Sequence, residues 1–147
     1  QILPELAGRL DDVVRGLEGL HGKSEGRARP IHGAPHPEQW LDDDGQLGLI
    51  DFDRFSLGDP ELDITTFQAE VDFERMPQSL RDEINGAFLA GYELRAGAAD
   101  QRLLLAYHVH KRLAKVQRSA RALRPDGDAR AARHLERVTA LLAGGDG

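Results

Sequence analysis

The segment Ile-His-Gly-Ala-Pro-His-Pro-Glu-Gln-Trp, residues 31 to 40, constrains most strongly what this chain can fold into. Gly33, Pro35 and Pro37 stand at every second position. Proline lacks the backbone N–H that a helix interior needs, and glycine loses more conformational entropy than any other residue. A helix therefore cannot continue through this segment, and we expect a loop between the elements on either side.

Two short apolar runs follow this loop and predict a β-hairpin. The runs are Trp40-Leu41 and residues 47–51, and they are separated by Asp-Asp-Asp-Gly-Gln, a composition typical of turns. A hairpin returns the chain upon itself, so Gln39 before the first strand and Asp51 at the end of the second are expected side by side. A carboxylate and an amide oxygen at one rim would suit Mg²⁺, which prefers hard oxygen ligands.

Helical patterns account for most of the remaining chain. Apolar residues at intervals of three and four indicate helices, and Asp59-Pro60 is typical of a helix start. The predicted fold class is α+β, mostly helical, with one small hairpin, in a single domain over residues 1–147. The loop and hairpin occupy residues 31–53 and the helical remainder residues 60–143. The predicted helices cover residues 4–20, 60–72, 80–97, 100–123 and a last segment that begins after residue 126.

Composition narrows the functional classes. The chain has no cysteine, which excludes disulfide scaffolds, thiolate chemistry and cysteine-ligated metal sites. Its formal net charge of −6 argues against nonspecific nucleic-acid binding. The basic residues gather after residue 100 without interleaved aromatic residues, so we predict no nucleic-acid partner. No apolar run approaches the roughly 20 residues of a membrane span. We expect a cytoplasmic protein without a membrane partner. Because the chain opens at Gln1 and has one methionine, Met76, we expect it to be a fragment.

Three linked motifs carry a resemblance to a known family. They are His-Gly-Ala-Pro-His-Pro-Glu-Gln at residues 32–39, Ile-Asp-Phe at 50–52 and Gly-Asp-Pro-Glu-Leu-Asp at 58–63. In this order they resemble the aminoglycoside phosphotransferase and choline kinase group of the protein-kinase-like fold. The resemblance implies the C-terminal lobe of such a fold, with ATP and Mg²⁺ as cofactors.

The resemblance also implies roles for individual residues. Asp51 matches the aspartate that binds the Mg²⁺ bridging the ATP phosphates, and Gln39 stands where the family usually has a metal-binding asparagine. Ala34 occupies the position of the catalytic aspartate, which accepts the proton of the substrate hydroxyl. His32 and His36 match members of the catalytic loop. The structural positions of the motif are Gly33, Asp59 and Asp63, of which the two aspartates brace the loop and cap the neighbouring helix.

One part of the family's machinery has no counterpart in this sequence. The other lobe of the fold supplies a glycine-rich cover over the phosphates and a strand lysine paired with a helix glutamate, and neither is found here. The resemblance therefore implies that ATP binds only with an N-terminal lobe, which becomes an expected partner. The other expected partner is a small molecule with a hydroxyl or amino-alcohol group.

Several residues have alternative interpretations. His32, His36 and Asp51 could instead bind zinc, although Gly33 and Pro35 disfavour the usual helical geometry. Trp40 could pack in the core or stack on a substrate. The acidic side chains after residue 60 could attract a cationic substrate or form a solvated helix face; they are Glu61, Asp63, Glu70, Asp72 and Glu74.

Two functions follow from these patterns. The first is the metal- and substrate-binding lobe of an ATP-dependent small-molecule phosphotransferase that acts on a hydroxyl group, with Glu38 as a possible substitute base. The second is a catalytically inactive, pseudokinase-like binding or regulatory module, and Ala34 is the observation that favours it.

Overall fold

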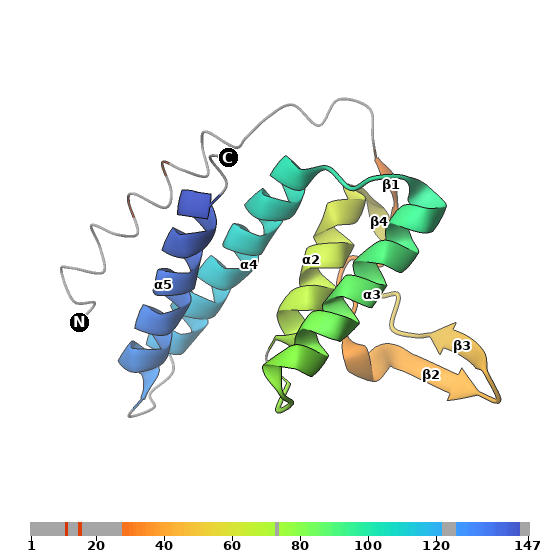
Figure 1. Ribbon diagram of the computed structural model, residues 1–147, viewed down its shortest axis with the longest axis horizontal. Helices are drawn as coiled ribbons and strands as arrows, with labels where there is room; N and C mark the ends of the chain where they lie inside the picture. Colours follow the sequence, from red (N-terminus) through yellow and green to blue (C-terminus); the bar gives the residue numbers. More distant parts are fainter. Residues whose placement is uncertain (1–10, 12–14, 16–27, 73, 122–125, 145–147) are drawn as a thin grey trace. The chain divides into compact units, whose positions relative to one another are not determined.

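The computed structural model describes residues 11, 15, 28–72, 74–121 and 126–144 of the chain. By its internal contacts the chain forms two compact units, residues 24–104 and residues 1–23 together with 105–147. The described part contains long helices and two short antiparallel strand pairs, which confirms the predicted fold class (Figure 1). The helix predicted over residues 4–20 lies outside the described residues, except for Asp11 and Arg15, which are helical.

The predicted hairpin is present. Strand β2 (Trp40–Asp43) pairs with β3 (Gln46–Leu49), and Trp40 lies opposite Leu49. The turn is two residues long, shorter than the five-residue turn predicted from composition. Asp44 has φ of 50° and Gly45 of 84°, the left-handed pair that a tight type I′ hairpin turn requires. The strands therefore extend closer to the turn than their apolar residues indicated.

A second strand pair was not predicted from the sequence. Strand β1 (Arg29–Ile31) pairs antiparallel with β4 (Ser56–Gly58). Each strand has three residues, too few for an alternating apolar pattern to stand out. The pairing brings the buried side chain of Ile31 against Gly58, where an added Cβ would lie 2.7 Å from the Ile31 Cδ1.

Two helices support the loop and the strands. Helix α2 (Pro60–Val71) begins at the predicted proline and packs against β1 and the short 3₁₀ helix η1 (Pro37–Gln39). Helix α3 (Gln78–Ala96) runs beside α2 (Figure 1). Ile64 of α2 is fully buried. Its cluster contains Ala99 and Leu104, with Phe88, Leu89 and Tyr92 packed against them.

The last two helices form an apolar pair. Helix α4 (Gln101–Arg121) and helix α5 (Gly127–Gly144) match the helices predicted in this region. Val109, Leu135 and Val138 are almost completely buried between them. Partly buried Leu105, Leu113, Val116 and Leu142 pack against this cluster. No helix in the described part of the chain is long and apolar enough to span a bilayer.

Candidate functional site

The loop that bears the first motif is anchored by one carboxylate of α2. Asp63, in the first turn of that helix, accepts hydrogen bonds from the backbone N–H of His32 at 2.6 Å and of Gly33 at 2.8 Å. Each carboxylate oxygen takes one of the two donors. Hydrogen bonds to an ionised acceptor are about twice as strong as neutral ones. Asp63 therefore fixes the start of the loop against the helix.

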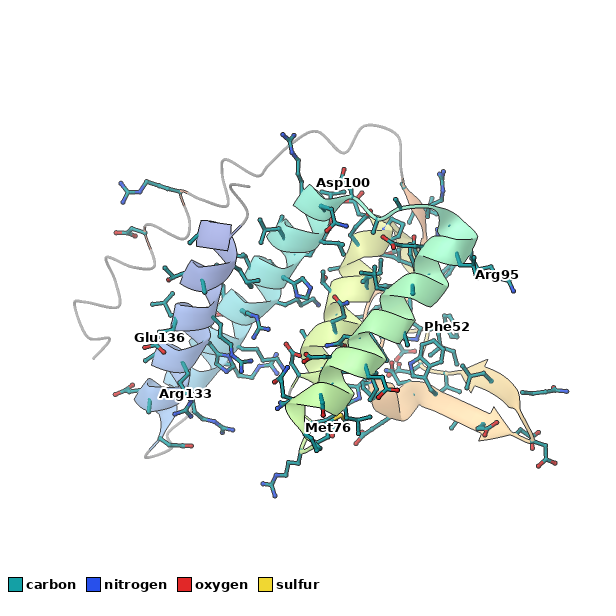
Figure 2. The ribbon with its side chains drawn as sticks, in the orientation of Figure 1. Phe52, Met76, Arg95, Asp100, Arg133 and Glu136 are labelled. Carbon is teal, nitrogen blue, oxygen red and sulfur yellow. The ribbon has the colours of Figure 1, made fainter. Side chains whose placement is uncertain are left out.

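The His32 side chain ties the loop to the end of the hairpin. Its Nε2 lies 2.9 Å from the carbonyl oxygen of Ile50. A carbonyl only accepts, so Nε2 is the donor in this contact. His32 is 5% exposed, and its ring packs against Phe52 at a centroid distance of 4.7 Å. Phe52 lies near the base of the hairpin (Figure 2). With its proton donated to a backbone carbonyl, His32 acts as a buried link between two segments.

Gly33 places the following residue through its backbone conformation. Its φ is +85°, and an added Cβ would overlap the carbonyl oxygen of Arg54. Only glycine satisfies both the left-handed conformation and this close approach. Ala34 comes directly after it and is half-buried. Its methyl group offers no atom that could accept a proton.

His36 caps η1 and faces helix α2. Its Nδ1 accepts the N–H of Glu38 at 3.3 Å, and its Nε2 lies 3.7 Å from Oε2 of Glu70. Glu70 was not among the predicted site residues. The signal was available, because Asp63 and Glu70 are seven residues apart and so lie on one face of the helix. That face of α2 holds the loop at two places.

Gln39 and Asp51 meet at the rim between η1 and the hairpin. The Nε2 of Gln39 donates to the Oδ2 of Asp51 at 2.9 Å, and the Ile50 N–H donates to the Gln39 carbonyl at 3.1 Å. Asp51 has φ of +68°, a conformation that aspartate tolerates better than most residues. The Asp51 side chain is exposed. The structure thus brings together the two side chains that the hairpin geometry predicted as neighbours.

The donor set at this rim fits a magnesium ion only in part. The Asp51 carboxylate supplies hard oxygen atoms, but Gln39 turns its amide nitrogen toward it, and its Oε1 accepts the His36 N–H at 2.7 Å. As arranged, the pair does not offer two oxygens to one cation. Zinc binding by His32, His36 and Asp51 is not supported either, because the described residues contain no group of three such side chains able to hold a metal.

Three acidic residues of α2 make specific contacts within the protein. Glu61 is 5% exposed, and its Oε1 accepts the backbone N–H of Asp100, just before α4, at 2.8 Å (Figure 2). Asp63 anchors the loop and Glu70 faces His36. The burial of Glu61 contradicts both interpretations for that residue, because a carboxylate in the first turn of a helix can also bind a backbone donor. For the partly exposed Asp63 and Glu70 both interpretations stay predictions.

Two further residues singled out in the sequence are Trp40 and Asp59. Trp40 packs edge-on against Phe67 and Phe88, at centroid distances of 6.0 and 6.1 Å, so it belongs to the packing between the hairpin and the helices. Asp59 is the N-cap residue of α2 but makes no side-chain cap hydrogen bond.

Burial, followed by the charges of Glu61 and Asp63, raises the pKa of Tyr92. The negative charges of Glu61 and Asp63 therefore disfavour ionisation of the Tyr92 hydroxyl.

The sequence of this chain is similar to one protein family. A model of the phosphotransferase enzyme family matches residues 2–105, a range that contains the loop, the hairpin and helices α2 and α3. Searches of curated proteins and of solved structures gave no match. The family match covers well over half of the chain and all three motifs. The chain therefore belongs to the phosphotransferase enzyme family.

Proposed function

We propose that this chain is the C-terminal lobe of a phosphotransferase-family protein that binds its ligands without transferring a phosphoryl group. The proposal depends most on Ala34. In phosphoryl transfer to a hydroxyl, a carboxylate accepts the hydroxyl proton and orients the attacking oxygen. A methyl group at that position does neither.

The neighbouring carboxylates support this proposal. Both oxygens of Asp63 already accept backbone N–H donors, and Asp51 accepts from Gln39. Moving Asp63 to serve as a base would leave the His32 and Gly33 N–H groups without their acceptor, and an unsatisfied buried donor costs about 1–3 kcal/mol. These two carboxylates are thus committed to holding the loop and the rim.

A retained scaffold suggests that ligand binding is what the chain preserves. The Asp63 anchor, the link from His32 to Ile50 and the capped η1 keep the loop in a defined shape although the residue at its catalytic position is alanine. Binding or regulation by a small hydroxyl or amino-alcohol compound is consistent with this preservation.

The surface beside the loop supports a cleft completed by a second lobe. Large apolar side chains are exposed along the hairpin and the segment after it, and Leu57 is 72% exposed. Exposed apolar side chains that a partner covers are typical of interaction sites. We propose that an N-terminal lobe covers this surface and that ATP binds only between the two lobes. The exposed side chains are Leu41, Leu47, Ile50, Phe52, Phe55 and Leu57.

The test is phosphoryl transfer by the protein together with its N-terminal lobe, measured over a panel of amino and hydroxyl acceptors. The native sequence is expected to give no transfer above background. Ala34→Asp is expected to raise transfer by about 100-fold or more, the usual contribution of a positioned acid or base. Ala34→Asn is the matched control, because it has the same shape without a basic carboxylate. Transfer by the native sequence that Ala34→Asp does not improve would contradict the proposal.

The second candidate is an active ATP-dependent phosphotransferase, and the exposed Asp51 carboxylate at the rim favours it. In that case Asp51 would contribute the charge that holds Mg²⁺ and Glu38, which is exposed on η1, would replace the missing base. Glu38→Gln separates the two candidates. It should abolish transfer if Glu38 is the base, and it should change nothing if the native chain transfers no phosphate.

A further inference from the structure

The orientation of the Gln39 amide is fixed by the chemistry of its partners. One end of the amide lies 2.7 Å from the backbone N–H of His36, which can only donate, so that end must be the oxygen. The nitrogen then faces Oδ2 of Asp51, which accepts its hydrogen at 2.9 Å. The opposite orientation would set two donors against each other at one end and two acceptors at the other.

The length of the glutamine side chain explains why its oxygen turns away from Asp51. Gln39 is the third residue after the N-cap His36, and its side chain reaches back to the N-cap N–H in a capping box. This motif uses glutamate or glutamine at the third position. The shorter asparagine, which the family usually has here, is one methylene short of this reach.

The backbone of Gln39 is held as firmly as its side chain. Its N–H donates to the carbonyl of His36 at 3.0 Å, and its own carbonyl accepts the N–H of Ile50 at 3.1 Å. With the two side-chain bonds, the backbone N–H, the backbone carbonyl and both ends of the side-chain amide each have a partner. Turning the amide oxygen toward Asp51 would therefore break two hydrogen bonds while the backbone stays fixed.

We propose that Gln39 is a positioning residue that holds the Asp51 carboxylate in place of a cation, so that these two side chains do not form a magnesium site. The amide N–H group presents positive partial charge to the carboxylate, as a cation would. It also steadies Asp51 in its left-handed conformation, which for a non-glycine residue costs about 1–3 kcal/mol. A cation between the two side chains would meet the hydrogens of the amide instead of its oxygen.

The experiment is a titration with Mn²⁺, a paramagnetic substitute for Mg²⁺, followed by the broadening of backbone amide signals around residue 51. The native chain is compared with Asp51→Asn, which should fold because asparagine tolerates positive φ. Asp43→Asn is the control that removes a carboxylate from the same hairpin. We expect the native chain and Asp51→Asn to bind Mn²⁺ around residue 51 with affinities that agree within about tenfold. A loss beyond that in Asp51→Asn alone would overturn the proposal.

Gln39→Glu provides the second arm. Its carboxylate keeps an acceptor for the His36 N–H and replaces the donor that faces Asp51 with an oxygen. This variant should gain saturable Mn²⁺ binding at least about tenfold tighter than that of the native chain, because affinity rises with the number of charged ligands. A folded Gln39→Glu protein that gains nothing would show that the amide is not the obstacle and would overturn the proposal. Because no phosphate is transferred in this assay, it can fail independently of the proposed function.

Discussion

The loop with its hairpin and the pair of helices α4 and α5 are stabilised by different kinds of contact. Backbone donors of the loop bind side-chain acceptors, as when His32 and Gly33 donate to Asp63. The helix pair instead buries an apolar cluster around Leu135. Hydrogen bonds depend on the position of single atoms, whereas apolar burial scales with area. Single-atom changes should therefore be felt more strongly in the loop than in the helix pair.

The largest effect is expected for Asp63→Asn, which removes one of the two acceptor oxygens that hold the loop. Asparagine keeps one acceptor oxygen and places an NH₂ group against a backbone N–H that needs an acceptor. The loss of one charge-assisted bond and the donor clash should lower the free energy of unfolding by about 3 kcal/mol. Urea denaturation measures this loss, and hydrogen exchange should show faster exchange at the His32 and Gly33 amides.

The control for this variant is Asp53→Asn, an isosteric change at an exposed aspartate of the same region. It should stay within about 0.5 kcal/mol of the native chain, as surface substitutions usually do. If the two variants were equally stable, the carboxylate of Asp63 would not be what holds the loop.

A smaller effect is expected for Gly33→Ala, with Gly45→Ala as its matched control. Both glycines have φ near +85°, but an added Cβ overlaps the Arg54 carbonyl at Gly33 and meets nothing within 4 Å at Gly45. The strain of positive φ should cost each variant about 1 kcal/mol, and the clash should bring Gly33→Ala to about 2 kcal/mol or more. Thermal unfolding of the two variants measures the difference, and equal losses would mean that the loop yields to the added methyl group.

The smallest effect is expected for His134 on α5, which tests the helix pair instead of the loop. Burial, followed by the charges of Arg112, Arg137, Lys115 and Arg130, lowers the pKa of this imidazole. The folded state then binds fewer protons than the unfolded chain, so stability falls as the pH drops through about 6.5 and below. His134→Gln should reduce this loss of stability in denaturation curves measured at pH 7.5 and pH 5.5.

The control for this pH dependence is His110→Gln, at an exposed position of α4. It should leave more of the pH dependence in place than His134→Gln does. If the two variants behaved alike, the surroundings of His134 would not be the source of the effect.

The sequence alone determined the elements whose signals are local. Pro60 after Asp59 set the start of α2, the apolar period set α3, α4 and α5, and the Asp-Asp-Asp-Gly-Gln segment set the place of the hairpin turn, although not its length. It also set the approach of Gln39 to Asp51, because a hairpin brings its two ends together whatever its surroundings. Each of these features follows from the conformational preferences of residues close together in the chain.

Only the tertiary structure decided what the polar side chains bind. The sequence could not reveal that Glu61 would be buried on the Asp100 N–H, or that Ile31 would pair with Ser56 in a second strand pair. It also could not reveal that the Gln39 oxygen would turn to His36 and leave the nitrogen for Asp51. A hydrogen bond is specified by the positions of two atoms, and these are set by how distant segments pack.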